Sequence, residues 1–164
     1  MRFERLNENH IVSKFNCGET FINDFLILDA LIWQSKDLTS CTLLVDDNSK
    51  VIGFYTLSFS NIHKKYFPKE NMPMRDISVV LLGMLGVDKK YRGADLGAML
   101  LVDAIKSTYE LYPKFGFKAL AIDALKDKSA AYFEHQGFTR LGESRKMILT
   151  IHDIKAVLEE NSIS

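Results

Sequence analysis

The sequence contains few of the residues that mark special classes of protein. Its 164 residues include two cysteines, three prolines, nine glycines and one tryptophan. Cys17 and Cys41 are too few for a disulfide framework and too isolated for a zinc site, so we expect both to be reduced packing residues. The low glycine and proline content, without any low-complexity tract, excludes fibrous and disordered classes. No spacing of histidine with cysteine or glutamate fits a metal site.

Neither sign of charge is in excess, and no long hydrophobic run is present. The chain carries 21 basic and 21 acidic residues, which argues against a dedicated nucleic-acid-binding module. Its longest stretches without a charged residue, 51–63 and 77–87, are shorter than the roughly 20 apolar residues that cross a bilayer. No basic leader with an apolar core opens the sequence, so we expect a cytoplasmic protein with no membrane contact.

The length and the order of the predicted elements indicate one α/β domain over residues 1–164. One helical stripe is predicted by the spacing of Phe21, Phe25, Leu28 and Ile32. Periodicity and turn residues predict the remaining elements in this order: strands at 1–8, 41–45 and 51–60, a loop at 63–74, a strand at 78–87, a helix at 98–112, a strand at 118–125, a helix at 127–136, a strand at 146–151 and a helix at 152–160.

The most informative segment is a buried strand, a short basic turn with glycines and then the longest predicted helix. A helix start leaves about four amides unpaired and carries roughly half a positive charge, so it attracts an anion. Arg92, with Lys89 and Lys90, adds positive charge at this point. No Gly-Lys-Ser/Thr follows, and the three-glycine spacing of dinucleotide-binding proteins is missing, so neither of those phosphate motifs applies.

This segment resembles the cofactor-binding segment of the GNAT acetyltransferases. The pyrophosphate loop of that family reads Arg/Gln-x-x-Gly-x-Gly/Ala after a bulged strand, and the matching stretch is Arg92-Gly93-Ala94-Asp95-Leu96-Gly97. Leu85-Gly86-Val87-Asp88 matches the preceding strand end, and Tyr132-Phe133-Glu134-His135-Gln136-Gly137-Phe138 matches a later family segment. The resemblance implies the GNAT fold, a mixed and mostly antiparallel sheet of about six or seven strands with a central bulged strand and helices on both faces.

Further segments are similar to the GNAT toxins of bacterial toxin–antitoxin pairs. They are Phe15-Asn16-Cys17-Gly18, Ile22-Asn23-Asp24-Phe25-Leu26, Gly53-Phe54-Tyr55-Thr56-Leu57-Ser58 and Ala121-Ile122-Asp123-Ala124. This resemblance implies an enzyme that moves an acetyl group from acetyl-CoA to the free amine of an aminoacyl-tRNA, which blocks translation. It also implies an antitoxin protein as partner and, as is frequent in the family, a homodimer.

The resemblance also implies which residues bind acetyl-CoA, the acyl donor. Main-chain groups of Leu85 and Val87 would hydrogen-bond the pantetheine arm like an added strand, in a slot opened by the bulge at residues 83–86. The amides from Gly93 to Ala98 would hold the pyrophosphate. The implied cofactor-binding residues are Leu85, Val87, Arg92, Gly93, Ala94, Asp95, Leu96, Gly97, Ala98, Ser129 and Phe133.

Three positions depart from the pattern of the family, and one of them, Met84, stands where the toxins commonly have an arginine, which removes an expected positive charge and weakens the RNA interpretation. Asp95 stands where the family has glycine, and its carboxylate would repel a diphosphate unless it points into solvent or caps the helix. Phe133 stands where the family has the tyrosine that protonates the leaving thiolate. Tyr132, the neighbour of Phe133, is therefore our candidate catalytic residue. Neighbouring side chains on a helix point about 100° apart, so Tyr132 can take this role only if the helix is rotated or shifted. Water is the alternative donor.

The resemblance leaves other functions open at this point. The acceptor could instead be a small molecule or a protein N-terminus, and a GNAT-shaped binding module with little catalysis is compatible with Asp95 and Phe133. An RNA acceptor would be attracted by a local basic patch despite the balanced net charge. The residues of that patch are Lys64, Lys65, Lys69, Lys89, Lys90 and Arg92.

Overall fold

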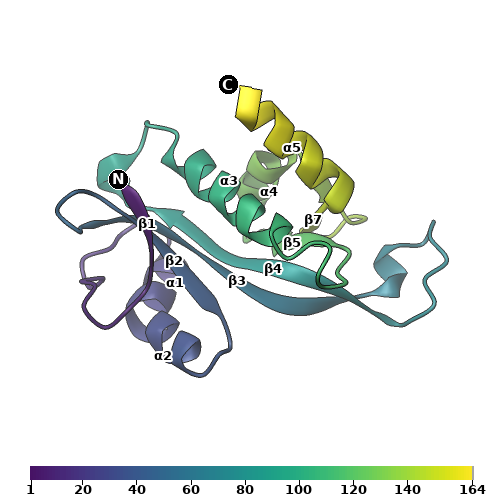
Figure 1. Cartoon of the computed structure of the whole chain (residues 1–164), viewed down its shortest axis with the longest axis horizontal. Coiled ribbons are helices and arrows are strands. Elements are labelled where there is room, and N and C mark those ends of the chain that lie inside the picture. The colour runs from purple at the N-terminus through teal and green to yellow at the C-terminus, as the bar shows by residue number, and fades with distance from the viewer. Residues whose placement is uncertain (164) are drawn as a thin grey trace. The chain divides into compact units, whose positions relative to one another are not determined.

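The structure is a computed structural model, which describes residues 1–163, and Figure 1 labels its elements. The strands are β1 (Arg2–Arg5), β2 (Ser40–Val45), β3 (Val51–His63), β4 (Asp76–Val87), β5 (Ala119–Asp123), β6 (Thr139–Arg140) and β7 (Lys146–Thr150). The α-helices are α1 (Thr20–Asp24), α2 (Ala30–Ser35), α3 (Leu96–Tyr109), α4 (Asp127–His135) and α5 (Ile151–Ile163). A π-helical turn, η1 (Phe25–Asp29), and two 3-10 turns, η2 (Lys64–Tyr66) and η3 (Lys89–Tyr91), complete the described elements.

Seven strands of the described residues form a sheet in the order β1-β2-β3-β4-β5-β7-β6. The pairs β1–β2, β2–β3, β5–β7 and β6–β7 are antiparallel, whereas β4 and β5 are parallel over Val80 and Leu81. The expected mixed, mostly antiparallel sheet is therefore confirmed. The predicted loop at 63–74 begins later than expected because β3 continues to His63. β6 was not predicted, since two residues carry no periodicity.

The chain divides into two compact units, which we describe separately. Unit 1 consists of Met1–Ser58 and Leu82–Ala104, and unit 2 consists of Phe59–Leu81 and Ile105–Ser164. β3, β4 and α3 contribute residues to both units. The expectation of one domain over residues 1–164 stays a prediction.

In unit 1, different helices cover the two faces of β3. A Cβ atom on Gly53 would lie against Leu100 of α3, whereas Phe54 belongs to a buried cluster with Phe25 and Leu26. Successive side chains of a strand point to opposite faces. The first part of α3 therefore covers one face and the segment from α1 to α2 covers the other, an arrangement that Figure 1 shows. Helices on both faces of the sheet were expected, and unit 1 has them.

Both cysteines of unit 1 are buried free thiols that belong to its hydrophobic cluster. Cys41 is 0% exposed. Its burial raises the pKa of the Cys41 thiol to about 12. Such a thiol stays protonated at neutral pH and behaves as a small hydrophobic side chain. The prediction of reduced packing residues is confirmed.

The predicted helical stripe is the element on which prediction and structure differ most. Phe25 is buried, but Phe21, Leu28 and Ile32 are 62%, 62% and 54% exposed. For Leu28 and Ile32 the cause is η1, where the amide of Ala30 donates to the carbonyl oxygen of Phe25. A bond across five residues instead of four shifts the phase of the helix and moves other side chains to the buried face. The buried residues of the segment are Phe25, Leu26, Ala30 and Gln34.

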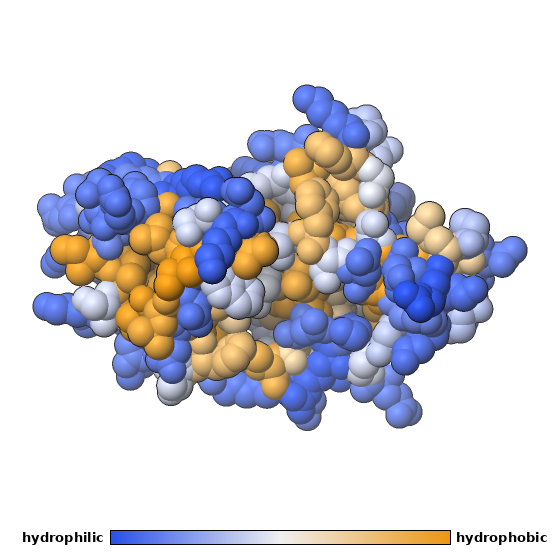
Figure 2. Space-filling view, turned by 90° about the horizontal axis from the view of Figure 1, so that it is seen from below, coloured by the Kyte–Doolittle hydropathy of each residue, from blue (hydrophilic) through white to orange (hydrophobic). Residues whose placement is uncertain are grey.

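This phase shift leaves a hydrophobic surface on unit 1, which we call the apolar face. Figure 2 looks at the side of unit 1 that carries α1, η1 and α2 and shows hydrophobic residues gathered over it. The apolar face consists of Phe21, Leu28, Leu31, Ile32, Trp33 and Leu38. Contiguous exposed apolar surface of this kind is typical of interaction sites in proteins.

Unit 2 has its own hydrophobic core. Its buried members are Ile62, Phe67, Ile77, Val79, Ala119, Ala121, Leu141 and Ile148. Phe133 of α4 is 6% exposed and lies 5.6 Å from Phe138, measured between ring centroids. Among the described residues, no helix combines the length and the apolar character needed to traverse a bilayer.

A substitution of Gly53 tests the packing of α3 against β3. A Cβ atom at this position would lie 2.7 Å from Leu100 Cδ1 and 2.8 Å from the Gly86 carbonyl oxygen, which belongs to the backbone and cannot rotate away. Gly53→Ala should therefore lower the free energy of unfolding by about 2 kcal/mol in urea titrations. Gly116→Ala is the control, because nothing lies within 4 Å of a Cβ atom there. Equal stability of the two variants would contradict this packing.

Candidate functional site

The loop between β4 and α3 presents a row of main-chain amides to solvent. Arg92, Gly93, Ala94 and Asp95 are exposed, whereas Leu96 is 5% exposed and fixes the start of α3 in the core. Within residues 1–163, no amide of residues 93–98 donates to a protein acceptor. Unpaired amides at a helix start, together with the helix dipole, form a site for an anion. The structure thus brings the predicted pyrophosphate-binding residues together on one loop.

Asp95 adopts a backbone conformation that favours glycine. Its φ is +54°, in the left-handed region, and φ of Gly93 in the same loop is +91°. The carbonyl oxygen of Asp95 accepts from Met99 N at 3.1 Å, so Asp95 directly precedes the helix. In the described part of the chain its carboxylate accepts no hydrogen bond, and the residue is exposed. Of the two alternatives for this side chain, the structure supports exposure to solvent over helix capping.

A buried carboxylate holds the beginning of the loop. Asp88 is 5% exposed, and its Oδ1 and Oδ2 accept from Lys90 N at 3.0 Å and from Asn16 N at 3.2 Å. The amide of Asp88 donates to the Ile52 carbonyl oxygen at 2.8 Å, and Lys89 N donates to the Asn16 carbonyl oxygen at 2.9 Å. The 3-10 turn η3 is therefore bonded both to β3 and to the turn at residues 16–18.

Two asparagine side chains fix that turn. Asn16 Oδ1 accepts from Gly18 N at 2.9 Å and from Asn23 Nδ2 at 3.1 Å. Asn23 Oδ1 accepts from Cys17 N at 2.8 Å. Asn23 lies on α1, so these bonds join the turn at residues 16–18 to the helical segment that follows it.

Arg92 joins this turn to the loop. Its Nη2 donates to the Cys17 carbonyl oxygen at 2.6 Å. The φ of Gly18 is +91°, a conformation that favours glycine, and a Cβ atom there would lie 2.8 Å from the same nitrogen and displace the guanidinium. A guanidinium has five N–H groups and keeps its charge, so this bond leaves Arg92 able to attract a diphosphate. That attraction stays a prediction. Burial raises the pKa of the Cys17 thiol, which makes this residue a poor nucleophile.

Leu85 and Val87 occupy the positions on β4 that the prediction requires. The amides of Met84 and Asp88 donate toward β3, to Thr56 Oγ1 and to the Ile52 carbonyl oxygen. Main-chain groups alternate in direction along a strand, so those of Leu85 and Val87 face away from β3. That orientation suits hydrogen bonds to an added strand-like arm, and the pantetheine contact stays a prediction.

The glycines of β4 mark close approaches within the protein. A Cβ atom on Gly86 would lie 3.1 Å from Ile22 Cγ2 and 3.3 Å from Cys17 Sγ. A Cβ atom on Gly83 would lie 3.0 Å from Thr56 Oγ1, the same oxygen that accepts from Met84 N at 2.9 Å. Thr56 is 2% exposed, and its side chain replaces a main-chain acceptor at this point of β4.

The remaining predicted site residues lie in unit 2, on α4. Phe133 is buried, Ser129 is half-buried and Tyr132 is 37% exposed. The rings of Tyr132 and Phe133 are 5.2 Å apart at an interplanar angle of 72°. Tyr132 is thus the more accessible of the two aromatic neighbours, and its catalytic role stays a prediction. Of the predicted basic patch, residues 64–69 belong to unit 2 and residues 89–92 to unit 1.

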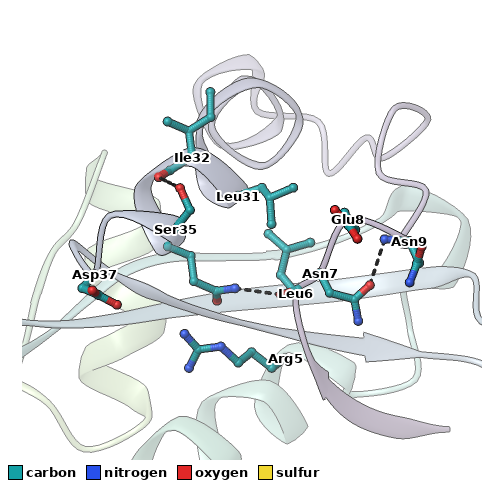
Figure 3. A pocket seen from close by; sticks show the side chains of 10 residues that line it. Arg5, Leu6, Asn7, Glu8, Asn9, Leu31, Ile32, Ser35 and Asp37 are labelled. Atoms are coloured by element: carbon teal, nitrogen blue, oxygen red, sulfur yellow. Dashed lines mark hydrogen bonds between the residues drawn. The ribbon is translucent and has the colours of Figure 1, made fainter.

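A surface groove of about 800 Å³ lies in unit 1, and Figure 3 shows it from close by. Its polar groups bond within the protein: Gln34 Nε2 donates to the Leu6 carbonyl oxygen at 2.7 Å and Asn9 N donates to Asn7 Oδ1 at 2.9 Å. Its charged lining residues are Arg5, Glu8 and Asp37, one basic and two acidic. This lining does not attract an anionic cofactor.

The roles of Asp88, Asn16 and Asn23 were not predicted from the sequence. A signal was present for Asp88, since aspartate directly before a helical turn is a preferred capping residue and the Asp88 side chain accepts from Lys90 N here. No signal in the sequence pairs Asn16 with Asp88, because the two residues are 72 positions apart.

Comparison with known proteins gives the following relatives. No family model matches the sequence. A tRNA-acetylating toxin of Mycobacterium tuberculosis (strain ATCC 25618 / H37Rv) is 31% identical over 137 residues, which are 82% of this chain and 81% of that protein. A probable toxin TacT of Sinorhizobium fredii (strain NBRC 101917 / NGR234) is 25% identical over an alignment of 169 positions, covering 94% of this chain and 93% of that protein.

Solved structures of toxins share the fold. A crystal structure of a KacT mutant superposes with a TM-score of 0.85 at 25% identity and covers 95% of this chain and 98% of that chain. AtaT complexed with acetyl-methionyl-tRNAfMet gives a TM-score of 0.84 at 24% identity, covering 96% and 98%. AtaTR bound with AcCoA gives 0.83 at 23% identity, covering 96% and 97%. The last two likenesses establish the fold alone.

The hydrogen bond from Met84 N to Thr56 Oγ1 can be tested by hydrogen exchange of the Met84 amide. Thr56→Val removes the acceptor of Met84 N–H and should speed hydrogen exchange of the Met84 amide by at least about tenfold, because its protection then depends on water exclusion alone. Thr56→Ser keeps the hydroxyl and should preserve the protection. The idea fails if exchange at Met84 is the same in the two variants, as measured by amide-resolved mass spectrometry or NMR.

Substitutions of Asp95 test whether the loop binds a diphosphate. A carboxylate about 4 Å from one phosphate charge costs about 1 kcal/mol in water, so Asp95→Asn should tighten acetyl-CoA binding about fivefold in calorimetry. Asp95→Gly should tighten it further, because glycine adopts φ of +54° without strain. If neither variant changes the dissociation constant, the loop does not bind the diphosphate.

Proposed function

Because the chain belongs to the GNAT toxins represented by the tRNA-acetylating toxin, we propose that it transfers acetyl from acetyl-CoA to the free amine of an aminoacyl-tRNA. The observation that carries this proposal is the row of six amides at residues 93–98, directly before and within the first turn of α3, that have no acceptor among the described residues. A diphosphate is the group that such a row binds best, since each amide donates to a phosphate oxygen at no cost in protein hydrogen bonds. Acetylation of the amine blocks its use in peptide-bond formation.

The donor is held by main-chain groups in this proposal. The diphosphate of acetyl-CoA lies on the amides of residues 93–98, with the charge of Arg92 beside it. The pantetheine arm pairs with the outward-facing main-chain groups of Leu85 and Val87. Neither contact depends on a flexible side chain, because η3 and β4 are fixed by the hydrogen bonds of Asp88 and Thr56. A fixed donor lowers the entropic part of the barrier to transfer.

The transfer itself is a substitution at the thioester carbonyl. The neutral amine of the aminoacyl ester attacks the carbonyl carbon, a C–N bond forms and the C–S bond breaks. The amine loses one proton, and the leaving thiolate of coenzyme A gains one. Tyr132 is the proposed donor to the thiolate, since its phenol hydroxyl can donate a proton. Water remains the alternative donor.

We extend the partners and the location of the related toxins to this chain. AtaT was solved bound to the C-terminus of the antitoxin AtaR, and we propose an antitoxin partner here as well. A homodimer and a place in the cytoplasm, where aminoacyl-tRNA is found, belong to the same proposal. The apolar face of unit 1 offers hydrophobic surface that such protein contacts bury.

The reaction can be tested with purified components. The protein, labelled acetyl-CoA and charged tRNA should yield N-acetyl-aminoacyl-tRNA, identified by mass spectrometry of the terminal aminoacyl adenosine after nuclease digestion. Ala98→Pro removes one of the six amides at a helix position where proline is tolerated, and it should lower kcat/KM for acetyl-CoA at least about tenfold. Ala98→Gly keeps the amide and serves as the matched control.

Two results would overturn different parts of the proposal. Acetylation of free amino acids or peptide N-termini, with charged tRNA untouched, would remove the RNA acceptor and keep the acetyltransferase. Failure to bind acetyl-CoA at millimolar concentration would remove the enzyme and leave a GNAT-shaped binding module.

A further inference from the structure

Unit 1 contains a second cavity, which we call the lysine cavity. Its volume is about 490 Å³, within the range of small-molecule sites. It is formed by three segments that are distant in sequence: residues 9–15, the hairpin between β2 and β3, and η3 with Asp88. Its lining includes Lys14, Lys50, Lys90, Asp88, Phe15 and Tyr91.

The lysine cavity is electropositive, although the whole chain has a net charge of zero. Lys14, Lys50 and Lys90 are exposed, and within the described residues their ammonium groups make no ion pair or hydrogen bond. Asp88 is the single acidic residue of the lining. Both of its oxygens accept main-chain amides, from Asn16 and Lys90, and the residue is only 5% exposed, so little of its carboxylate faces the cavity. Three ammonium groups around one cavity favour an anion.

The wall of the cavity is partly apolar. Phe15 is 5% exposed and Val51 is 9% exposed, so both present only a small surface, while Tyr91 is half-buried and Ile11 is 75% exposed. Side chains of this kind contact a sugar or a base, and lysine ammonium groups contact a phosphate as mobile point charges. An apolar wall beside three ammonium groups thus matches the chemistry of a nucleotide. The groove of Figure 3 differs, because its acidic residues outnumber its basic one.

We propose that the lysine cavity binds a nucleotide of the acceptor RNA through its phosphodiester. This inference rests on the proposed function, which supplies an RNA as one of the two reactants. The diphosphate of the other reactant, acetyl-CoA, already has the amides of residues 93–98. RNA carries further phosphates beyond its reacting end, and these need cationic contacts away from the amide row. Lys90 lies two residues before Arg92, so the cavity is continuous in sequence with the loop.

The test removes two lysines that lie outside the loop. Lys14→Gln with Lys50→Gln should raise KM for charged tRNA roughly tenfold and leave kcat and the acetyl-CoA dissociation constant unchanged. The salt dependence of tRNA binding, measured by fluorescence anisotropy, should lose about 1.5 from the slope of log K against log salt concentration. Lys14→Arg with Lys50→Arg keeps both charges and should restore binding. Lys36→Gln with Lys114→Gln removes two exposed lysines elsewhere and is the matched control.

The anisotropy measurement uses uncharged tRNA, so it measures the affinity of the lysine cavity for RNA even if the protein proves not to acetylate RNA. The inference is overturned if the variant at positions 14 and 50 binds tRNA like the control variant, or if the native protein does not bind tRNA at low salt. It is also overturned if the variant loses affinity for coenzyme A but not for coenzyme A lacking its 3′-phosphate. That result would assign the lysine cavity to the nucleotide of the cofactor.

Discussion

The buried carboxylate of Asp88 is the group on which the rest of the site depends. A carboxylate taken out of water is costly unless hydrogen bonds replace its hydration. Here two main-chain amides, of Asn16 and Lys90, supply those bonds from segments that are far apart in the sequence. The turn at residues 16–18 and the loop after β4 are therefore stabilised together. The loop can leave six amides unpaired for a ligand because its beginning is fixed by bonds elsewhere.

The site combines groups of two kinds. Main-chain amides and the helix dipole have fixed positions and suit a group of fixed geometry such as a diphosphate. Lysine ammonium groups on long side chains adapt to their ligand and suit a polymer whose phosphates vary in position. Unit 1 has both, at residues 93–98 and at Lys14, Lys50 and Lys90. A balanced net charge is compatible with this arrangement, since binding depends on where charges lie and not on their sum.

Much of the fold could be predicted from the sequence, because strands such as 51–60 and 78–87 have strong periodicity and clear turn residues. The loop at residues 92–98 could be located for the same reason, with a family motif in addition. The hydrogen-bond network that holds the loop could not be predicted. Bonds such as that from Met84 N to Thr56 Oγ1 depend on the pairing of two strands, which local sequence patterns do not specify. The phase of the first helical segment could not be predicted either, because η1 changes which residues of 20–35 are buried, whereas the apolar spacing predicts one regular helix.

The π-helical turn decides which side chains of the segment at residues 20–35 face solvent. Such a turn is equivalent to one extra residue in an α-helix, and one residue rotates everything that follows by about 100°. In a regular α-helix over the same residues, Leu28 and Ile32 would lie three and seven residues after the buried Phe25, on its face, and Ala30 and Gln34 would turn away from the core. The same sixteen residues at 20–35 therefore present an apolar or a more polar outer surface according to the hydrogen-bond pattern of a single turn.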